Sequence, residues 1–148
     1  MTAYRKWVGH RCSPRTVLAE RGQILLFAKA TGETNPLYTD AEAARARGFR
    51  DVIAPPTFLF CLASLSGVAD DLAAEMDLPA GRILHGEQAF EYGAMIAAGD
   101  AIRLDHQVED IFDKKDGALT FIRTRTDGVN QDGQSVGASL ATVVVTAP

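Results

Sequence analysis

The segment from Thr57 to Val68 constrains the fold more than any other part of this sequence, because it is long, apolar and free of charged residues. Its phenylalanine and leucine residues fall on nearly every side of a helix, and a helix that is apolar all round is a buried one. Two prolines, Pro55 and Pro56, precede it, and Thr57 is a suitable N-cap. The sequence therefore predicts a buried central helix over about residues 57–68, against which the remaining elements must pack.

The second half of the chain has the residue spacing of strands rather than helices. Runs that alternate or are rich in β-branched residues occur at 88–92, 101–112, 119–126 and 136–146. Turn-forming pairs separate them, and the Asp-Gly pairs at 116–117 and 132–133 are typical of hairpins. In the first half, helices are predicted at 20–31 and 41–47. One buried helix against an antiparallel sheet is an α+β arrangement.

Composition and charge exclude several classes of function. The net charge of -4 gives no reason to expect a nucleic-acid partner. No apolar run approaches the ~18–20 residues of a membrane span, and residues 1–10 lack the apolar core of a signal peptide. The sequence has neither a Cys/His set with metal-ligand spacing nor a glycine-rich phosphate loop, so no metal or cofactor is expected. We expect a single cytoplasmic domain, residues 1–148.

The string with the most chemical content is Thr-Gly-Glu-Thr-Asn-Pro-Leu-Tyr at residues 31–38. Together with Ala-Pro-Pro-Thr-Phe at 54–58, His-Gly-Glu-Gln at 85–88 and Ala-Gly-Asp at 98–100, it resembles the MaoC-like dehydratase family, in particular its N-terminal type of domain. That family includes (R)-specific enoyl-CoA hydratases and 3-hydroxyacyl-thioester dehydratases. The resemblance covers about residues 5–146. It implies a hot-dog fold, in which an antiparallel sheet wraps a long central helix, and an acyl-CoA or acyl-carrier thioester as the ligand.

The resemblance also implies a catalytic pair at Glu33 and Tyr38, where the family has aspartate and histidine. Hydrating an enoyl thioester requires a base that activates water and an acid that delivers a proton to the α-carbon, and a carboxylate beside an imidazole can do both. Glutamate could still be a base, but its extra methylene displaces the carboxylate, and catalysis is sensitive to shifts of ~1 Å. Tyrosine, with a reference pKa near ~10, is a poor replacement for imidazole. The alternative is a capped turn in which both side chains only form hydrogen bonds.

The start of the central helix departs from the family in a second way. In active relatives a His-Gly loop precedes this helix, and its backbone N–H groups help to polarise the thioester carbonyl. Here Pro55 or Pro56 occupies the glycine position, and proline has no N–H to donate. A structural role, fixing where the helix begins, is compatible with the same residues. The resemblance places these substrate-binding residues: Asn35, Pro55, Pro56, Thr57, Phe58 and His85.

Two histidines fall on or beside predicted strands, and they receive different interpretations. His85 lies either at the mouth of an acyl pocket or at a strand end, with its ring hydrogen-bonded to the backbone. Along the run 101–112, strict alternation places one set of residues on the same face: Ile102, Leu104, His106, Val108 and Asp110. A structural role is expected for His106, because it falls in the middle of a strand.

The degenerate pair and the missing N–H donor predict a component of an acyl-thioester dehydratase or hydratase, with little or no catalysis of its own. It would serve the interconversion of (R)-3-hydroxyacyl and trans-2-enoyl thioesters, with Phe58, Phe60 and Leu62 lining or backing an acyl channel. A partner chain would supply the aspartate and histidine, and the exposed edge of a hot-dog sheet predicts a homodimer or heterodimer. Three alternatives remain open: a homodimeric hydratase that uses Glu33, a hot-dog acyl-CoA thioesterase, and a binding module without turnover.

Overall fold

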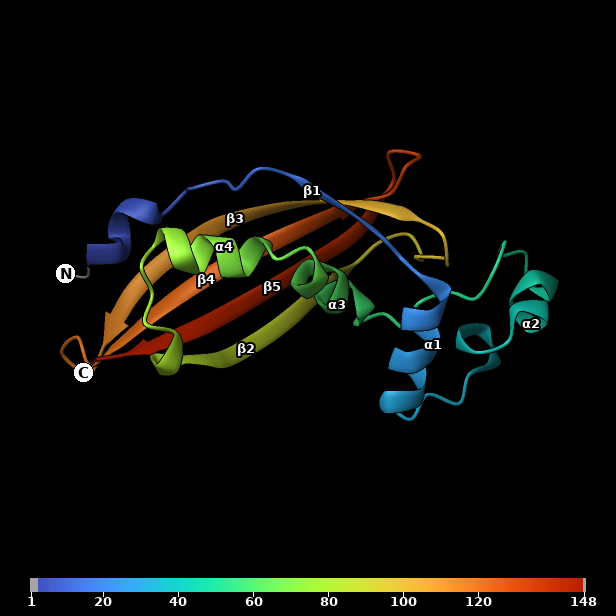
Figure 1. Ribbon diagram of the computed structural model, residues 1–148, viewed down its shortest axis with the longest axis horizontal. Helices are drawn as coiled ribbons and strands as arrows, with labels where there is room; N and C mark the ends of the chain where they lie inside the picture. Colours follow the sequence, from blue (N-terminus) through green and yellow to red (C-terminus); the bar gives the residue numbers. More distant parts are fainter. Residues whose placement is uncertain (1–2, 148) are drawn as a thin grey trace.

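The computed structural model describes residues 3–147, so residues 1, 2 and 148 of the predicted domain lie outside the described part. The strands are β1 Arg15–Leu18, β2 Ile83–Tyr92, β3 Ala101–Lys114, β4 Leu119–Val129 and β5 Ser135–Thr146. They form one antiparallel sheet in the order β1-β3-β4-β5-β2 (Figure 1), in which β2 is an edge strand. The two predicted Asp-Gly hairpins are confirmed, because they connect β3 to β4 and β4 to β5.

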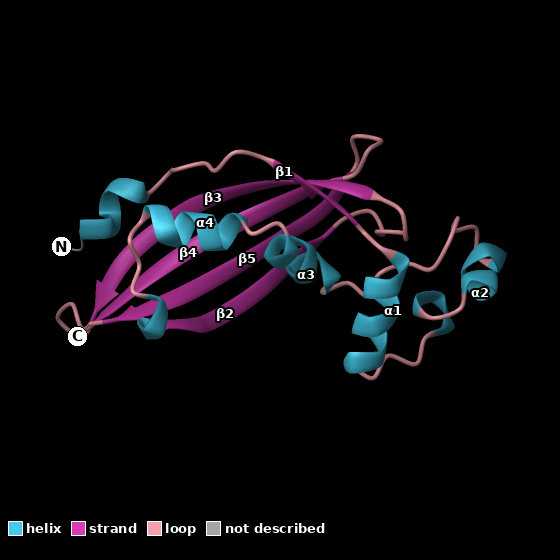
Figure 2. Ribbon diagram, viewed as in Figure 1, coloured by secondary structure: helices cyan, strands magenta, loops and turns pink. Residues whose placement is uncertain are grey.

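The helices fall into two groups. They are α1 Arg21–Ala30, α2 Ala41–Ala46, α3 Phe58–Leu65 and α4 Val68–Glu75, with short 3-10 turns η1 Ala3–Trp7, η2 Pro36–Tyr38 and η3 Ala80–Arg82. Figure 2 shows α3 and α4 lying over one face of the sheet, whereas α1 and α2 extend beyond one end of it. The helices predicted at 20–31 and 41–47 are confirmed as α1 and α2, and the predicted α+β class is confirmed. No helix among residues 3–147 is both long enough and apolar enough to cross a membrane.

The predicted central helix differs from the observed one in length and in exposure. It ends at Leu65, because Gly67 adopts the left-handed conformation (φ 71°) and separates α3 from α4. Thr57 occupies the N-cap position but its side chain forms no capping hydrogen bond. Phe60 and Leu65 are 39% and 55% exposed, so the helix is buried on one side only. Apolar periodicity could not separate a helix buried all round from one with an exposed apolar face.

The two helices over the sheet each cover a separate hydrophobic cluster. Around α3, Phe58 and Leu62 pack with Ile102 and Leu104 of β3. Around α4, the cluster consists of Leu72, Met76, Val108, Ile111, Ile122 and Val145. Burial of these side chains removes apolar surface from water and holds the helices on the sheet.

Strand β3 contains a bulge that changes which residues face the helices. Its pairing with β4 shifts register between Val108 and Asp110, so Ile111 pairs with Ile122 and enters the core. The alternation predicted for this strand is confirmed from Ile102 to Val108 and is wrong for Asp110. A β-bulge adds one residue to one strand and thereby reverses the faces beyond it.

Candidate functional site

A cavity of about 250 Å³ lies between α3, α4 and the sheet, and we call it the helix–sheet cavity. Its lining includes apolar residues of α4 and the strands, among them Leu72, Ala73, Met76, Ile83, Ile122 and Val143. The same cavity is bordered by five polar side chains of the sheet: His85, His106, Thr124, Thr126 and Ser139. An apolar cavity with a few polar groups is the usual form of a small-molecule site. Its lining suits a hydrocarbon chain.

The mouth of this cavity lies at the edge strand β2. Phe60 and His85 border the helix–sheet cavity and also an open hollow that includes Thr57, Gln88 and Phe90. The two aromatic rings meet edge to face at 5.8 Å. His85 lies within β2, is exposed, and its Nε2 is 3.3 Å from the side-chain oxygen of Gln88. The His85 ring therefore contacts the side chain of Gln88, and the residue borders both the cavity and the hollow.

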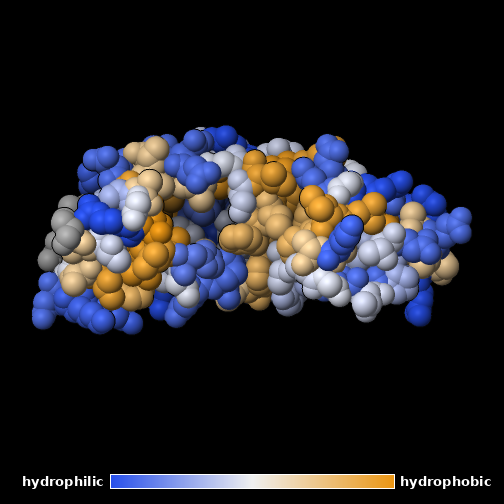
Figure 3. Space-filling model, turned by 60° about the horizontal axis from the view of Figure 1, so that its bottom comes forward, coloured by the Kyte–Doolittle hydropathy of each residue, from blue (hydrophilic) through white to orange (hydrophobic). Residues whose placement is uncertain are grey.

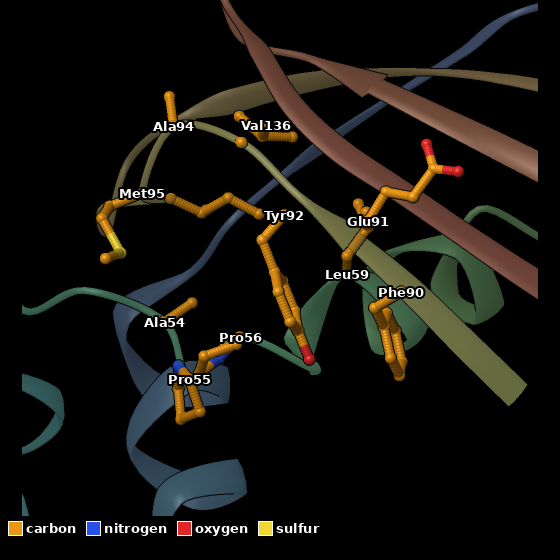
Figure 4. A pocket seen from close by; sticks show the side chains of 12 residues that line it. Ala54, Pro55, Pro56, Leu59, Phe90, Glu91, Tyr92, Ala94, Met95 and Val136 are labelled. Atoms are coloured by element: carbon orange, nitrogen blue, oxygen red, sulfur yellow. The ribbon is translucent and has the colours of Figure 1, made fainter.

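A second cavity, of about 220 Å³, lies at the start of α3 and contains the two prolines (Figure 4). Pro55 is buried, and its carbonyl oxygen accepts a hydrogen bond of 2.9 Å from the N–H of Phe58. Figure 4 shows the ring of Tyr92 reaching from β2 toward both prolines, while the carboxylate of Glu91 points away from the cavity. The prolines therefore stand at the beginning of the helix and also line a cavity.

The residues of the predicted catalytic pair lie outside these cavities. Glu33 follows the last turn of α1, where its N–H donates to the carbonyl of Ala28 at 2.9 Å, and its side chain is exposed. Tyr38 is half-buried at the end of η2. Neither side chain has a hydrogen-bond partner among residues 3–147, and neither lines the cavities described above. Asn35 between them accepts a hydrogen bond of 3.0 Å from the N–H of Leu37 and so caps η2.

An exposed apolar groove, the α1–α3 groove, lies between α1 and α3. It is lined by Leu26, Phe27, Ala30, Phe58, Phe60, Cys61 and Leu65, together with two polar residues. Leu26 is 68% exposed, whereas Phe58 is 1% exposed and packs edge to face on Phe27 at 5.4 Å. Figure 3 shows hydrophobic residues gathered in the middle of one face of the molecule. Contiguous apolar surface of this kind marks an interaction site.

His106 lies deep in the helix–sheet cavity, and burial changes its chemistry. It is 5% exposed, and its Nδ1 lies 2.7 Å from the hydroxyl of Thr126 on β4. Its Nε2 is buried and has no hydrogen-bond partner among the described residues. Burial lowers the pKa of the imidazole to about 4, so the ring is neutral at pH 7. Strand alternation placed His106 on the covered face, but the sequence carried no signal for the cavity beside it.

Comparisons with known proteins agree on one family. Residues 6–138 match the family described as FAS1-like, dehydratase domain region. The chain is 35% identical to a UPF0336 protein of Streptomyces griseus, over 99% of this chain and 97% of that protein. It superposes with a TM-score of 0.81 and 26% identity on the HadBC (3R-hydroxyacyl-ACP dehydratase) complex of Mycobacterium tuberculosis, covering 93% and 96% of the two chains. A solved MaoC-like dehydratase gives a TM-score of 0.78 and 26% identity over 98% of this chain and 44% of that one. The predicted hot-dog fold is thereby confirmed.

Proposed function

Because this chain belongs to the FAS1-like dehydratase-region family of MaoC-like hot-dog proteins, we propose that it is a subunit of an acyl-thioester dehydratase or hydratase. The enzyme would interconvert (R)-3-hydroxyacyl and trans-2-enoyl thioesters by removing or adding water. This chain binds the acyl part of the thioester and contributes little or no proton transfer. A second hot-dog chain supplies the aspartate and histidine that carry out the reaction.

The observation that carries this proposal is that nothing among the described residues orients the side chains at the two catalytic positions, Glu33 and Tyr38. In the dehydration direction, a base removes a proton from the α-carbon and an acid protonates the hydroxyl that leaves the β-carbon. Such groups must be held to within about 1 Å of their working positions. Glu33 is exposed, and neither its carboxylate nor the hydroxyl of Tyr38 has a partner among residues 3–147 that would orient it. With proline at the start of α3, the N–H donor expected there is also missing.

The helix–sheet cavity supports the acyl-binding part of the proposal. Its walls come from α3, from α4 and from the sheet, and most of the residues that line it are apolar. A methylene group that moves from water into such a site contributes about 0.8 kcal/mol. A chain could enter past Phe60 and His85, which border both the cavity and the open hollow beside it. The reacting end of the thioester would then remain outside, where a partner chain can reach it.

Two adjacent features support a partner chain. Strand β2 is an edge of the sheet, and the backbone of an edge strand has free N–H and C=O groups that can pair with another strand. The α1–α3 groove exposes Leu26 and Leu65, and it shares Phe27 and Phe60 with the hollow that also contains Gln88 of β2. The solved HadBC protein is described as a complex, and this chain superposes on 96% of one of its chains. We therefore propose a second hot-dog chain as the partner on this surface.

The first experiment is hydration of crotonyl-CoA by the purified chain alone, followed by the loss of enoyl absorbance. We expect turnover at or near the uncatalysed rate, because the imidazole and the N–H donor are both missing. Co-expression with a short MaoC-like chain from the same genome that carries the Asp and His should give a copurifying complex with clear activity. Replacing Asp in that partner should abolish the activity, whereas Glu33→Gln in this chain should leave it nearly unchanged.

Two results would contradict the proposal in different ways. Robust hydration by the purified chain, abolished by Glu33→Gln, would identify a self-sufficient hydratase in which Glu33 is the base. Release of free thiol from acyl-CoA without change in enoyl absorbance would identify a thioesterase instead. A Tyr38→Phe variant is the matched control, since it removes only the phenolic hydroxyl at the second catalytic position.

A further inference from the structure

A row of polar side chains crosses the mainly apolar floor of the helix–sheet cavity. His106 of β3 pairs in register with Thr126 of β4, and Thr126 pairs with Ser139 of β5. We call these three residues the polar row. All three are less than one-tenth exposed and all line the cavity. The next aligned positions toward α4 are Val108, Thr124 and Ala141, of which only Thr124 is polar.

The hydrogen bonds of the polar row leave one strong group unused. The side-chain N–H of Gln88 donates to the hydroxyl of Ser139 at 2.9 Å, and the hydroxyl of Thr126 lies 2.7 Å from Nδ1 of His106. Nε2 of His106 has no partner among residues 3–147, although it is buried. A buried polar atom without a partner costs about 1–3 kcal/mol. His106 lines the cavity, so a small turn of its ring would let a molecule inside the cavity supply the missing partner.

The protonation of His106 limits what that partner can be. Its environment favours the neutral ring, which has one N–H donor and one acceptor nitrogen. The hydroxyl of Thr126 can accept from Nδ1 or donate to it, so Nε2 can either accept a hydrogen bond or donate one. A hydroxyl satisfies both possibilities, because it donates or accepts, and a carbonyl satisfies the one in which Nε2 donates. A plain alkyl chain would leave Nε2 unsatisfied.

We propose that the helix–sheet cavity selects acyl chains that carry a hydroxyl or keto oxygen beyond the reacting carbons, and that His106 Nε2 binds this oxygen. The inference rests on the proposed function in one respect, namely that the cavity receives an acyl chain. From β2 to β3 there are three strand-to-strand steps, or roughly 14 Å. An oxygen at the reacting end, near the mouth at His85, is therefore too far from His106, and the group recognised must lie well along the chain.

The proposal is tested by calorimetric titration of the purified chain with dodecanoyl-CoA and with a series of hydroxydodecanoyl-CoA esters whose hydroxyl is moved along the chain. At one or two adjacent positions the hydroxylated ester should bind about fivefold to tenfold more tightly than the plain ester, as one net hydrogen bond allows. In His106→Phe the preference should reverse, because the hydroxyl then loses its partner. Thr126→Val, which removes the group that orients the ring, should weaken the preference.

Thr124→Val is the matched control, because Thr124 lines the same cavity but its side chain has no hydrogen bond to His106. It should retain the preference. If the plain ester binds at least as tightly as every hydroxylated ester, the cavity holds only water at His106 and the proposal is wrong. A preference that survives in folded His106→Phe would equally reject it. Failure of both ester classes to bind the folded chain would instead reject the acyl cavity itself, on which the proposed function also depends.

Discussion

At the scale of single residues, His106 is the side chain whose burial has the clearest measurable consequence. Its pKa is lowered to about 4 in the folded protein by desolvation, from an ordinary value of 6.5. Between these two values the unfolded chain binds a proton that the folded protein excludes. The free energy of unfolding must therefore fall as the pH is lowered from about 6.5 to about 4. Above pH 6.5 both states are neutral at this residue, so no dependence arises from it.

Urea unfolding at a series of pH values from 7 to 4 tests this expectation. Complete protonation of the unfolded state against a neutral folded ring would cost up to about 3 kcal/mol. His106→Phe, which cannot take up the proton, is the comparison. Equal acid sensitivity of the two proteins would show that His106 is not buried in the neutral form.

At the scale of elements, the pairing of β2 with β5 depends on a glycine. Gly137 has φ 115°, and a Cβ atom at this position would collide with the carbonyl oxygen of Glu91 on β2. The contact is with backbone, which cannot move without separating the strands. Gly133, in the turn between β4 and β5, also has a positive φ (76°) but has open space around it. The two glycines therefore separate the effect of strand contact from the effect of backbone conformation.

Gly137→Ala should destabilise the protein by more than Gly133→Ala, which should cost about 1 kcal/mol for the left-handed backbone alone. Thermal or urea unfolding of both variants measures the difference. A change in the shape of the proline cavity would be a second sign of strand separation, because Tyr92 lines that cavity and pairs with Gly137 in register. Equal destabilisation by the two substitutions would mean that β2 moves away from β5 at little cost.

At the scale of the whole molecule, the exposed apolar surface and the free sheet edge lie on connected elements. The α1–α3 groove contains Leu65, which is 55% exposed, and the hollow next to it includes Gln88 and Phe90 of the edge strand β2. A partner that pairs with β2 could therefore cover the groove at the same time. The turn η1 lies at the other end of the molecule, so a substitution near it can serve as a control for one in the groove (Figure 1).

Leu65→Glu should weaken association with the partner chain by at least tenfold, because a charge would be buried without a partner in the interface. Val8→Glu, which changes a smaller apolar residue that is 42% exposed near η1, should leave association unchanged. Sedimentation of each variant alone and with the co-expressed chain measures the effect. Circular dichroism controls for folding, and loss of association by both variants would argue against the groove as the interface.

The sequence by itself determined the local elements and the family. Helices α1 and α2, both hairpins and the α+β class follow from apolar spacing and Asp-Gly turns, because these signals act between residues close in the chain. The string at 31–38 identified the family, and the comparisons confirmed it. The roles of Glu33, Tyr38 and the predicted binding residues remain predictions.

Only the tertiary structure decided where the cavities lie and which side chains meet in them. The break between α3 and α4 depends on the left-handed conformation of Gly67. The bulge in β3 places Ile111 in the core, where strict alternation would have placed Asp110. His106 and Thr126 are twenty residues apart in the chain and meet only because two strands adopt one register. Such contacts depend on register and packing between distant segments, which residue spacing within one segment does not specify.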